Sequence, residues 1–120
     1  VVGVESRGFI LGSILAYHLN AGFVLLRKPG KLPAETYSVN YSLEYGTNTL
    51  ELHKDSLVED DVVLMHDDLL ATGGSAEAAL QLINMFNVEK TYLDFMVELS
   101  FLNGRDRLKK YGDIESLIVY

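Results

Sequence analysis

Two adjacent carboxylates are followed in this sequence by hydroxyl-bearing and glycine residues, a combination that suits a phosphorylated sugar. Asp67 and Asp68 come after the apolar run 62–65, and residues 72–75 read Thr-Gly-Gly-Ser. Hydroxyls and bare backbone N–H groups at the start of a helix bind phosphate, whereas carboxylates accept hydrogen bonds from vicinal hydroxyls. The stretch therefore predicts a site for a 5-phosphoribosyl group. The plainer alternative is an Asx turn and helix cap with exposed carboxylates.

Basic residues gather near the start of the sequence and indicate a local anion site. The first 34 residues carry a net charge of +3, whereas the remainder carries −10. Arg7 precedes a predicted helix that begins near Gly8, where a guanidinium and free N–H groups can hold an anion. Arg27, Lys28 and Lys31 form a second cluster beside two prolines. The alternatives are a surface arginine on a turn and a solvated basic loop.

The composition excludes several other chemistries. The sequence has no cysteine, which excludes disulfides, zinc ribbons and thiol nucleophiles. His18, His53 and His66 are too far apart in the sequence to predict a metal site. No dinucleotide fingerprint, Walker motif or nucleophile elbow occurs. The net charge of −7 disfavours nucleic acid and anionic lipid as partners, and the lack of a long apolar run or leader favours a cytoplasmic protein without a membrane partner.

Two strand–helix–strand units position these residues in a chain of 120 residues, which is enough for one domain. Apolar spacing predicts the first unit over residues 1–5, 9–19 and 23–26, and the second over residues 61–66, 75–86 and 91–99. Residues 67–74 are expected to form a loop, with Ser75 near the helix N-cap. A short helix over residues 105–111 and a strand over residues 117–120 complete the pattern. It predicts a three-layer α/β domain with a mainly parallel sheet and a site at the strand C-termini.

Residues 27–57 separate the two units and hold both prolines of the chain. The alternating runs 41–43 and 50–52 flank residues 44–48, so we expect a hairpin. An excursion this long inside a small α/β domain is usually functional or mobile.

Several segments together resemble a known family. Residues 67–74 (DDLLATGG) resemble the phosphoribosyl diphosphate (PRPP) motif of type I phosphoribosyltransferases, and more closely the version in the adenine phosphoribosyltransferases. Four further segments agree in order: residues 5–9 (ESRGF), 27–33 (RKPGKLP), 41–46 (YSLEYG) and 97–99 (VEL). Two positions depart from the pattern, since Ser75 stands where threonine is common and His66 where an aliphatic residue is usual. We expect His66 to pack in the core.

The resemblance implies a fold, a reaction and partners. The fold is the three-layer type I phosphoribosyltransferase fold, with residues 1–120 as its core domain and a flexible catalytic loop over about residues 34–54. The reaction converts adenine and PRPP to AMP and pyrophosphate in purine salvage. Magnesium would be bound mainly through PRPP, without direct protein ligands, and the protein would be a homodimer. Family members carry a helical hood before the position of Val1, which is expected to be missing here.

The resemblance also assigns roles to individual residues. The expected catalytic residues are Glu44, which would handle the purine proton, together with Arg7, Asp67 and Asp68. The 5-phosphate is expected on Ala71, Thr72, Gly73, Gly74 and Ser75, and the ribose on Asp67 and Asp68. Pyrophosphate is expected on Ser6, Arg7, Gly8, Arg27 and Lys31. Tyr45 belongs to the closing loop, while Leu69 and Leu99 would sandwich the base. The alternatives are a solubilising role for Glu44 and ordinary core positions for the two leucines.

Two other functions stay open at this point. One is the same transfer with another purine base, such as xanthine or hypoxanthine. The other is a non-catalytic regulator that keeps the fold to sense PRPP or a nucleotide. The presence of both Glu44 and the motif 67–75 favours the enzyme over the regulator.

Overall fold

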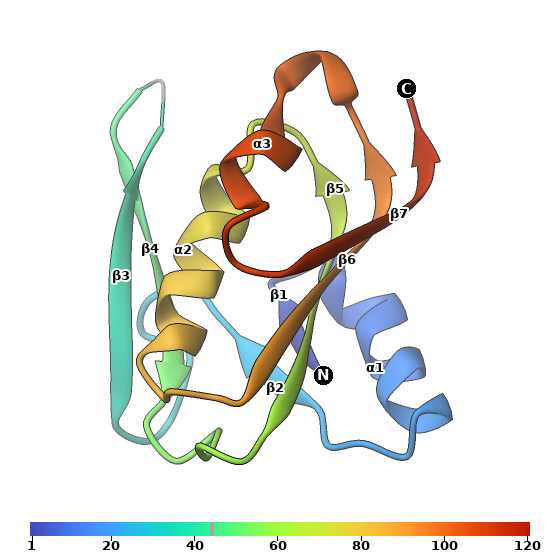
Figure 1. The fold of residues 1–120 in the computed structure, drawn as a ribbon. Coiled ribbons are helices and arrows are strands. Elements are labelled where there is room, and N and C mark those ends of the chain that lie inside the picture. Colours follow the sequence, from blue (N-terminus) through green and yellow to red (C-terminus); the bar gives the residue numbers. More distant parts are fainter. Residues whose placement is uncertain (44) are drawn as a thin grey trace.

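Five parallel strands form the central sheet of the protein (Figure 1). The computed structural model describes every residue of the chain except Glu44. In spatial order the strands are β2 (Val24–Leu26), β1 (Val2–Val4), β5 (Val62–Leu70), β6 (Lys90–Glu98) and β7 (Asp113–Val119). Each neighbouring pair is parallel. The predicted α/β architecture with a parallel sheet is confirmed.

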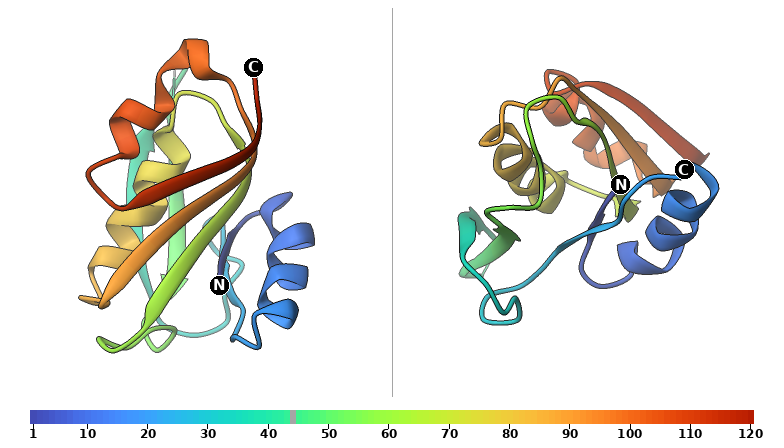
Figure 2. Two further views of the ribbon diagram at one scale, coloured as in Figure 1. Left: turned by 45° about the vertical axis from the view of Figure 1, so that its right-hand side comes forward. Right: turned by 90° about the horizontal axis from the view of Figure 1, so that it is seen from below.

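Helices cover both faces of the sheet (Figure 2). Helix α1 (Gly8–His18) lies on one face, while α2 (Gly74–Asn84), the 3-10 turn η1 (Ser100–Leu102) and the short α3 (Gly104–Leu108) lie toward the other. The antiparallel hairpin of β3 (Thr36–Ser42) and β4 (Thr47–His53) packs on the outer side of α2. The predicted three layers are present, with the hairpin as a further cover. No helix in the described part of the chain is long and apolar enough to span a membrane.

The hydrophobic core lies between the sheet and α2. Met65 and Phe95 from the sheet and Leu80 and Ile83 from the helix are fully buried. The buried positions of α2 recur three and four residues apart, as one apolar helix face requires. Each such side chain contributes about 1.5–3 kcal/mol when it leaves water. The core therefore fixes α2 against the strand that precedes it in the chain.

Helix α1 approaches its face of the sheet closely because it presents small residues to it. Gly8, Gly12 and Ala16 are its buried positions. A Cβ added at Gly12 would lie 3.2 Å from the Phe23 ring and 3.5 Å from the ring of His66. His66 is fully buried in this layer, as expected, and its Nδ1 lies 2.6 Å from a carboxylate oxygen of Asp94.

Several element boundaries differ from the prediction. Strand β5 continues to Leu70, so Asp67 and Asp68 lie in the strand and not in a loop. The reason is the ladder with β6, which pairs Asp67 with Phe95 and extends past both carboxylates. Helix α2 begins at Gly74, one residue before the predicted start at Ser75, and its N-cap is Gly73. Helix α3 is only residues 104–108, and β7 begins at residue 113, where its alternating polar residues pair with β6.

Candidate active site

The site lies where the connections from two neighbouring strands diverge. The chain leaves β1 toward α1 on one face of the sheet, and it leaves β5 toward α2 on the other face (Figure 1). Open α/β sheets bind ligands at such a point, outside the carboxyl ends of the strands. A cleft of about 460 Å³ occupies this position, lined by Arg7, residues 67–76 and the hairpin residues 41–43.

The phosphate loop, residues 71–75, forms one end of the cleft. Gly73 has a φ of 86°, in the left-handed region that only glycine adopts without strain, and it caps α2 without a side-chain hydrogen bond. The first N–H groups of a helix lack intrahelical partners, so they are free to bind an anion. Thr72 and Ser75 line the same end with hydroxyls. The residues predicted for the 5-phosphate are thus brought together.

The acidic pair, Asp67 and Asp68, forms the floor of the cleft. Asp67 is buried, and its Oδ1 accepts a hydrogen bond of 2.8 Å from the backbone N–H of Asp68. Burial, assisted by the neighbouring carboxylate of Asp68, raises the pKa of Asp67 to about 7. Burial also acts to raise the pKa of Asp68, but the hydrogen bond and charge of Arg7 outweigh it and hold that pKa below its ordinary value. The two carboxylates therefore differ in charge at neutral pH.

Arg7 connects the ends of the two strands. Its Nε donates to Oδ2 of Asp68 over 2.5 Å, and 74% of its side chain remains exposed. Its guanidinium borders both the main cleft and a smaller, polar cavity of about 240 Å³. The predicted partners Ser6 and Arg7 line this smaller cavity together. Gly8 instead packs against β5, because a Cβ there would lie 3.0 Å from the carbonyl oxygen of His66.

The basic loop, residues 27–31, is held by Glu5. The carboxylate of Glu5 accepts hydrogen bonds from Nε of Arg27 and the backbone N–H of Lys28, both at 2.9 Å. Lys31 Nζ lies 3.9 Å from it. Burial acts to raise the pKa of Glu5, yet these donors and charges hold it below the ordinary value. Arg27 and Lys31 face Glu5 in this structure, and their contact with pyrophosphate stays a prediction.

Several residues border the smaller cavity without having been assigned a role from the sequence, and three of them are polar residues of the basic loop and the hairpin. They are Lys28, Tyr41 and Asn48, which face Arg7 and the acidic pair across it. Lys28 belongs to the basic cluster and Tyr41 to the segment 41–46, so both carried a signal. Asn48 carried none, because only the pairing of the hairpin strands brings it to the site.

The remaining predicted residues are placed as follows. Leu69 lines the main cleft with 36% of its surface exposed, as a base-contacting residue requires. Leu99 is half-buried beyond the end of β6, where its N–H donates to the carbonyl oxygen of Leu70. Tyr45 is 88% exposed near the tip of the hairpin. Glu44, the predicted proton-handling residue, lies outside the described residues.

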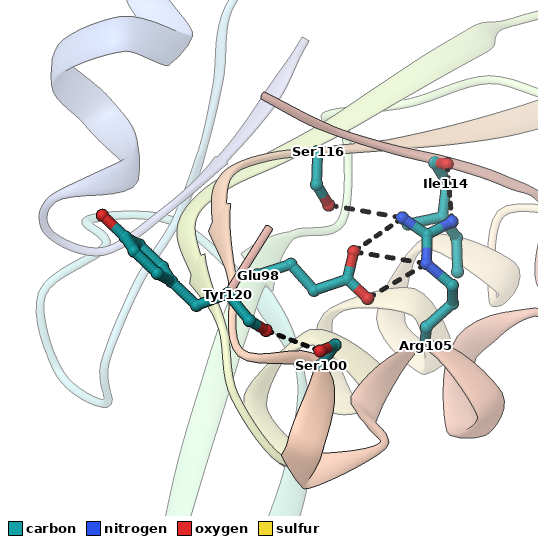
Figure 3. Close-up of polar contacts among 6 residues, drawn as sticks. All are labelled: Glu98, Ser100, Arg105, Ile114, Ser116 and Tyr120. Carbon is teal, nitrogen blue, oxygen red and sulfur yellow. Dashed lines mark hydrogen bonds and ion pairs between the residues drawn. The ribbon is translucent and has the colours of Figure 1, made fainter. Parts of the chain in front are cut away.

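An ion pair between the buried carboxylate of Glu98 and the partly exposed Arg105 joins the end of β6 to α3 (Figure 3). Glu98, at the end of β6, accepts a bidentate pair of hydrogen bonds from Arg105, which also donates to the carbonyl oxygen of Ile114. This pair anchors α3, whose first residue Gly104 packs against Gly73 with no room for a Cβ. The left-handed turn at Gly73 is therefore supported by contacts outside the cleft.

Comparison with known proteins identifies the family of this chain. The phosphoribosyl transferase domain family matches residues 1–113. The chain belongs to that family. An adenine phosphoribosyltransferase of Bacteroides thetaiotaomicron is 54% identical over 98% of this chain and 67% of the relative, and one of Koribacter versatilis is 55% identical over 100% and 65%. The chain thus spans about two thirds of the length of these relatives.

Solved structures of the family share the fold. The adenine phosphoribosyltransferase of Rhodothermus marinus superposes with a TM-score of 0.93 at 49% identity, covering 99% of this chain and 68% of that one. The Giardia lamblia enzyme complexed with 9-deazaadenine superposes with a TM-score of 0.94 at 43% identity, again covering 99% and 68%. The predicted type I phosphoribosyltransferase fold is confirmed.

Proposed function

We propose that the protein transfers the 5-phosphoribosyl group of PRPP to adenine, giving AMP and pyrophosphate in purine salvage. One observation carries the proposal. The acidic pair and the phosphate loop, which lie in one segment, border one cleft at the strand ends together with Arg7, which precedes Asp68 by 61 positions. The names of the relatives support adenine as the base.

Each part of PRPP has a chemically matched place. The 5-phosphate binds at the N-terminus of α2, where N–H groups and the hydroxyls of Thr72 and Ser75 converge. The ribose hydroxyls donate to the acidic pair. The pyrophosphate lies toward the smaller cavity, on Arg7, Ser6 and Lys28. These positions orient the C1 atom of the ribose toward the side of the cleft that Leu69 and the hairpin border.

The transfer breaks the bond from ribose C1 to the pyrophosphate oxygen and forms a bond from C1 to N9 of adenine. The pyrophosphate leaves with the bonding electrons, and N9 loses its proton, for which Glu44 is the proposed acceptor. Positive charge develops on the ribose in the transition state, next to the carboxylates of the acidic pair. Preorganised groups of this kind typically account for about 10²- to 10³-fold in rate. The hairpin residues 41–43 form the wall that limits access of water.

Magnesium fits this site as an ion that is bound mainly to PRPP. Within the described residues, no group of three or more His, Cys, Asp or Glu side chains is arranged to hold a metal ion. Mg²⁺ prefers phosphate and other oxygen ligands, and it would neutralise charge on the departing pyrophosphate. Asp67 and Asp68 line the smaller cavity together with Arg7, so their oxygen atoms would be near such an ion.

The assembly and location belong to the same proposal. Ile10 and Tyr17 on α1 and Leu117 on β7 are each more than 70% exposed, which supports a homodimer that covers such side chains. The net charge of −7 supports small anionic substrates held by local cations, and not nucleic acid, as partners. A cytoplasmic location is part of the same proposal, and it is supported by the proposed reaction.

The test is an assay of the intact protein with magnesium, PRPP and either adenine or hypoxanthine. Formation of AMP with adenine, and a much lower rate with hypoxanthine, is the expected outcome, because a site built for an amino group leaves polar groups unpaired with a keto group. Asp67→Asn and Asp68→Asn should lower turnover more than PRPP affinity. PRPP binding without product from any purine would point to the regulator instead.

A further inference from the structure

Glu51 ties the basic loop to the hairpin through three different groups. It lies in β4, and one of its carboxylate oxygens accepts a hydrogen bond of 2.7 Å from the backbone N–H of Gly30. The other oxygen accepts from the hydroxyl of Thr36 in β3, over 2.9 Å. Its backbone exchanges two hydrogen bonds with Arg27, of 2.9 and 2.7 Å. One residue therefore joins both strands of the hairpin to both ends of the loop.

The strand β4, which carries Glu51, is packed against the hydrophobic core. The neighbours of Glu51 in the strand, Leu50 and Leu52, are 2% and 0% exposed and belong to the hydrophobic core. Because side chains alternate along a strand, the carboxylate of Glu51 points to the opposite side from these leucines. In the partner strand β3, the ring of Tyr37 packs edge-on against Phe86, with 5.5 Å between the ring centroids. A loop that is bonded to these two strands is therefore held relative to the core.

The contacts divide the basic loop into two parts. The backbone pairing at Arg27 does not depend on the Glu51 side chain, so it persists when that side chain is removed. Gly30 has a φ of 77° and forms the turn immediately before Lys31, and its N–H depends on the carboxylate. Removal of the carboxylate therefore frees the distal part of the loop and leaves its start in place.

We propose that Glu51 is a positioning residue that holds the basic loop in place for the pyrophosphate of the substrate. The proposal rests on the proposed function, because it concerns the same site. Glu5 holds the side chains of Arg27 and Lys31 and the backbone at Lys28, whereas the carboxylate of Glu51 holds the backbone at Gly30, immediately before Lys31. The loop is then ordered before the substrate arrives, so binding does not have to bear the entropy of ordering it.

Charge and position predict opposite effects for Glu51, which makes the proposal testable. If the carboxylate acted only through its charge, its removal would strengthen binding of an anion nearby. If it acts by position, Glu51→Ala should weaken binding although a negative charge is lost. Glu51→Gln keeps one acceptor for Gly30 and a donor for Thr36, so it should bind as well as the wild type or better. Glu51→Asp keeps the charge but is one methylene too short to reach both partners, so it should resemble Glu51→Ala.

The experiment is calorimetric titration of the intact protein and its variants with magnesium pyrophosphate. Glu51→Ala and Glu51→Asp should weaken the affinity about tenfold, as expected for a lost hydrogen bond to a charged group, and Glu51→Gln should restore it. The control is Glu35→Ala, which removes an exposed carboxylate of the same region, 3.7 Å from Lys54, and should change nothing. Thermal unfolding is recorded for each variant, and Glu51→Asp replaces Glu51→Ala in the comparison if Glu51→Ala does not fold.

Kinetics separate this proposal from the proposed function. In the assay with adenine, Glu51→Ala should raise the KM for PRPP while the KM for adenine and kcat stay near the wild-type values. Equal affinities for magnesium pyrophosphate in all variants, or tighter binding by Glu51→Ala, would overturn the positioning role. A wild-type protein that binds magnesium pyrophosphate but forms no AMP would overturn the proposed function, and the calorimetric comparison would still decide the role of Glu51.

Discussion

The Nε of Arg7 and a carboxylate oxygen of Asp68 lie 2.5 Å apart, although 61 positions separate the two residues in the chain. The contact joins the end of β1 to the end of β5 across the point where their connections diverge. It fixes one edge of the guanidinium and holds the pKa of Asp68 below its ordinary value against the opposing effect of burial. Arg7 is thereby oriented before any anion binds.

Removal of the Arg7 guanidinium should weaken pyrophosphate binding. Arg7→Met should lower the affinity for magnesium pyrophosphate by roughly 10- to 100-fold, because hydrogen bonds to charged groups are worth about 1.5–3 kcal/mol. Lys109→Met is the matched control, since Lys109 is exposed and its ion pair among the described residues is with Asp106 at 3.5 Å. Calorimetry measures the affinity of both variants for magnesium pyrophosphate. An unchanged affinity in Arg7→Met would show that Arg7 does not bind pyrophosphate.

Asp67 should make the protein less stable as the pH rises. Its pKa is about 7 in the folded protein, above the ordinary value of 3.8, so folding favours the protonated form. The free energy of unfolding should therefore fall as the pH rises from about 4 through 7. Asp67→Asn removes the titrating group, so the variant should gain stability over the wild type at pH 8 and much less at pH 5. Urea unfolding at the two pH values measures this, and equal differences would contradict the raised pKa.

The turn at Gly73 should not tolerate a side chain. Gly73→Ala places a Cβ 3.2 Å from the carbonyl oxygen of Gly104 at a φ of 86°. Strain of this kind costs about 1–3 kcal/mol, and relief of it would displace the phosphate loop. Gly22→Ala is the control, because a Cβ there meets nothing within 4 Å. The midpoint temperature of unfolding and the affinity for AMP should both fall for Gly73→Ala and not for Gly22→Ala. An unchanged AMP affinity in Gly73→Ala would show that this turn does not shape the phosphate site.

Arg105 should stabilise the protein through the buried carboxylate of Glu98. Arg105→Met leaves that carboxylate, which is 4% exposed, without its bidentate partner. The free energy of unfolding at pH 7 should fall by about 1–2 kcal/mol, the lower part of the range for a buried acceptor left without its partner, because the Arg105 side chain is 43% exposed and water screens the pair. The exposed pair of Lys90 and Asp113, at 3.8 Å, is the control, and Lys90→Met should have a much smaller effect.

The same pair predicts a dependence on acid. Hydrogen bonds from Arg105 hold the pKa of Glu98 below the ordinary value of 4.5, against the effect of burial. Its contribution is therefore present above about pH 4.5 and is lost as the pH falls through the lower, folded-state pKa. Arg105→Met should lose this part of the acid dependence in urea unfolding. An unaltered acid profile would mean that the pair does not determine it.

Local spacing predicts the parts of the site that lie within one segment. Residues 67–75 carry the carboxylates, hydroxyls and glycines that line the cleft, so sequence was sufficient to predict that these residues lie together. The strand boundary was wrong because aspartate has a low strand propensity. Pairing with Phe95 and Val97 of β6 overrides that propensity, and such pairing is not visible in the sequence around Asp67.

Contacts between distant segments could not be predicted in this way. The basic residues Arg27 and Lys31 stand out by charge, but nothing near them in the sequence shows that Glu5 accepts a hydrogen bond from Arg27 and forms an ion pair with Lys31. Glu51 appears in sequence as an ordinary polar position of an alternating strand. Only the fold brings its carboxylate to the N–H of Gly30. The sequence therefore predicted the candidate site residues, and the fold shows which other residues hold the basic loop in place.

The location of the phosphoribosyl group is the central claim, and a crystal structure of the intact protein with AMP tests it most directly. The account predicts the 5-phosphate at the N-terminus of α2, in contact with residues 71–75, and the ribose hydroxyls on Asp67 and Asp68. It also predicts the adenine beside Leu69, with Arg7 left free for pyrophosphate. AMP bound with its phosphate on Arg7 or on the basic loop, and with the phosphate loop empty, would contradict the account.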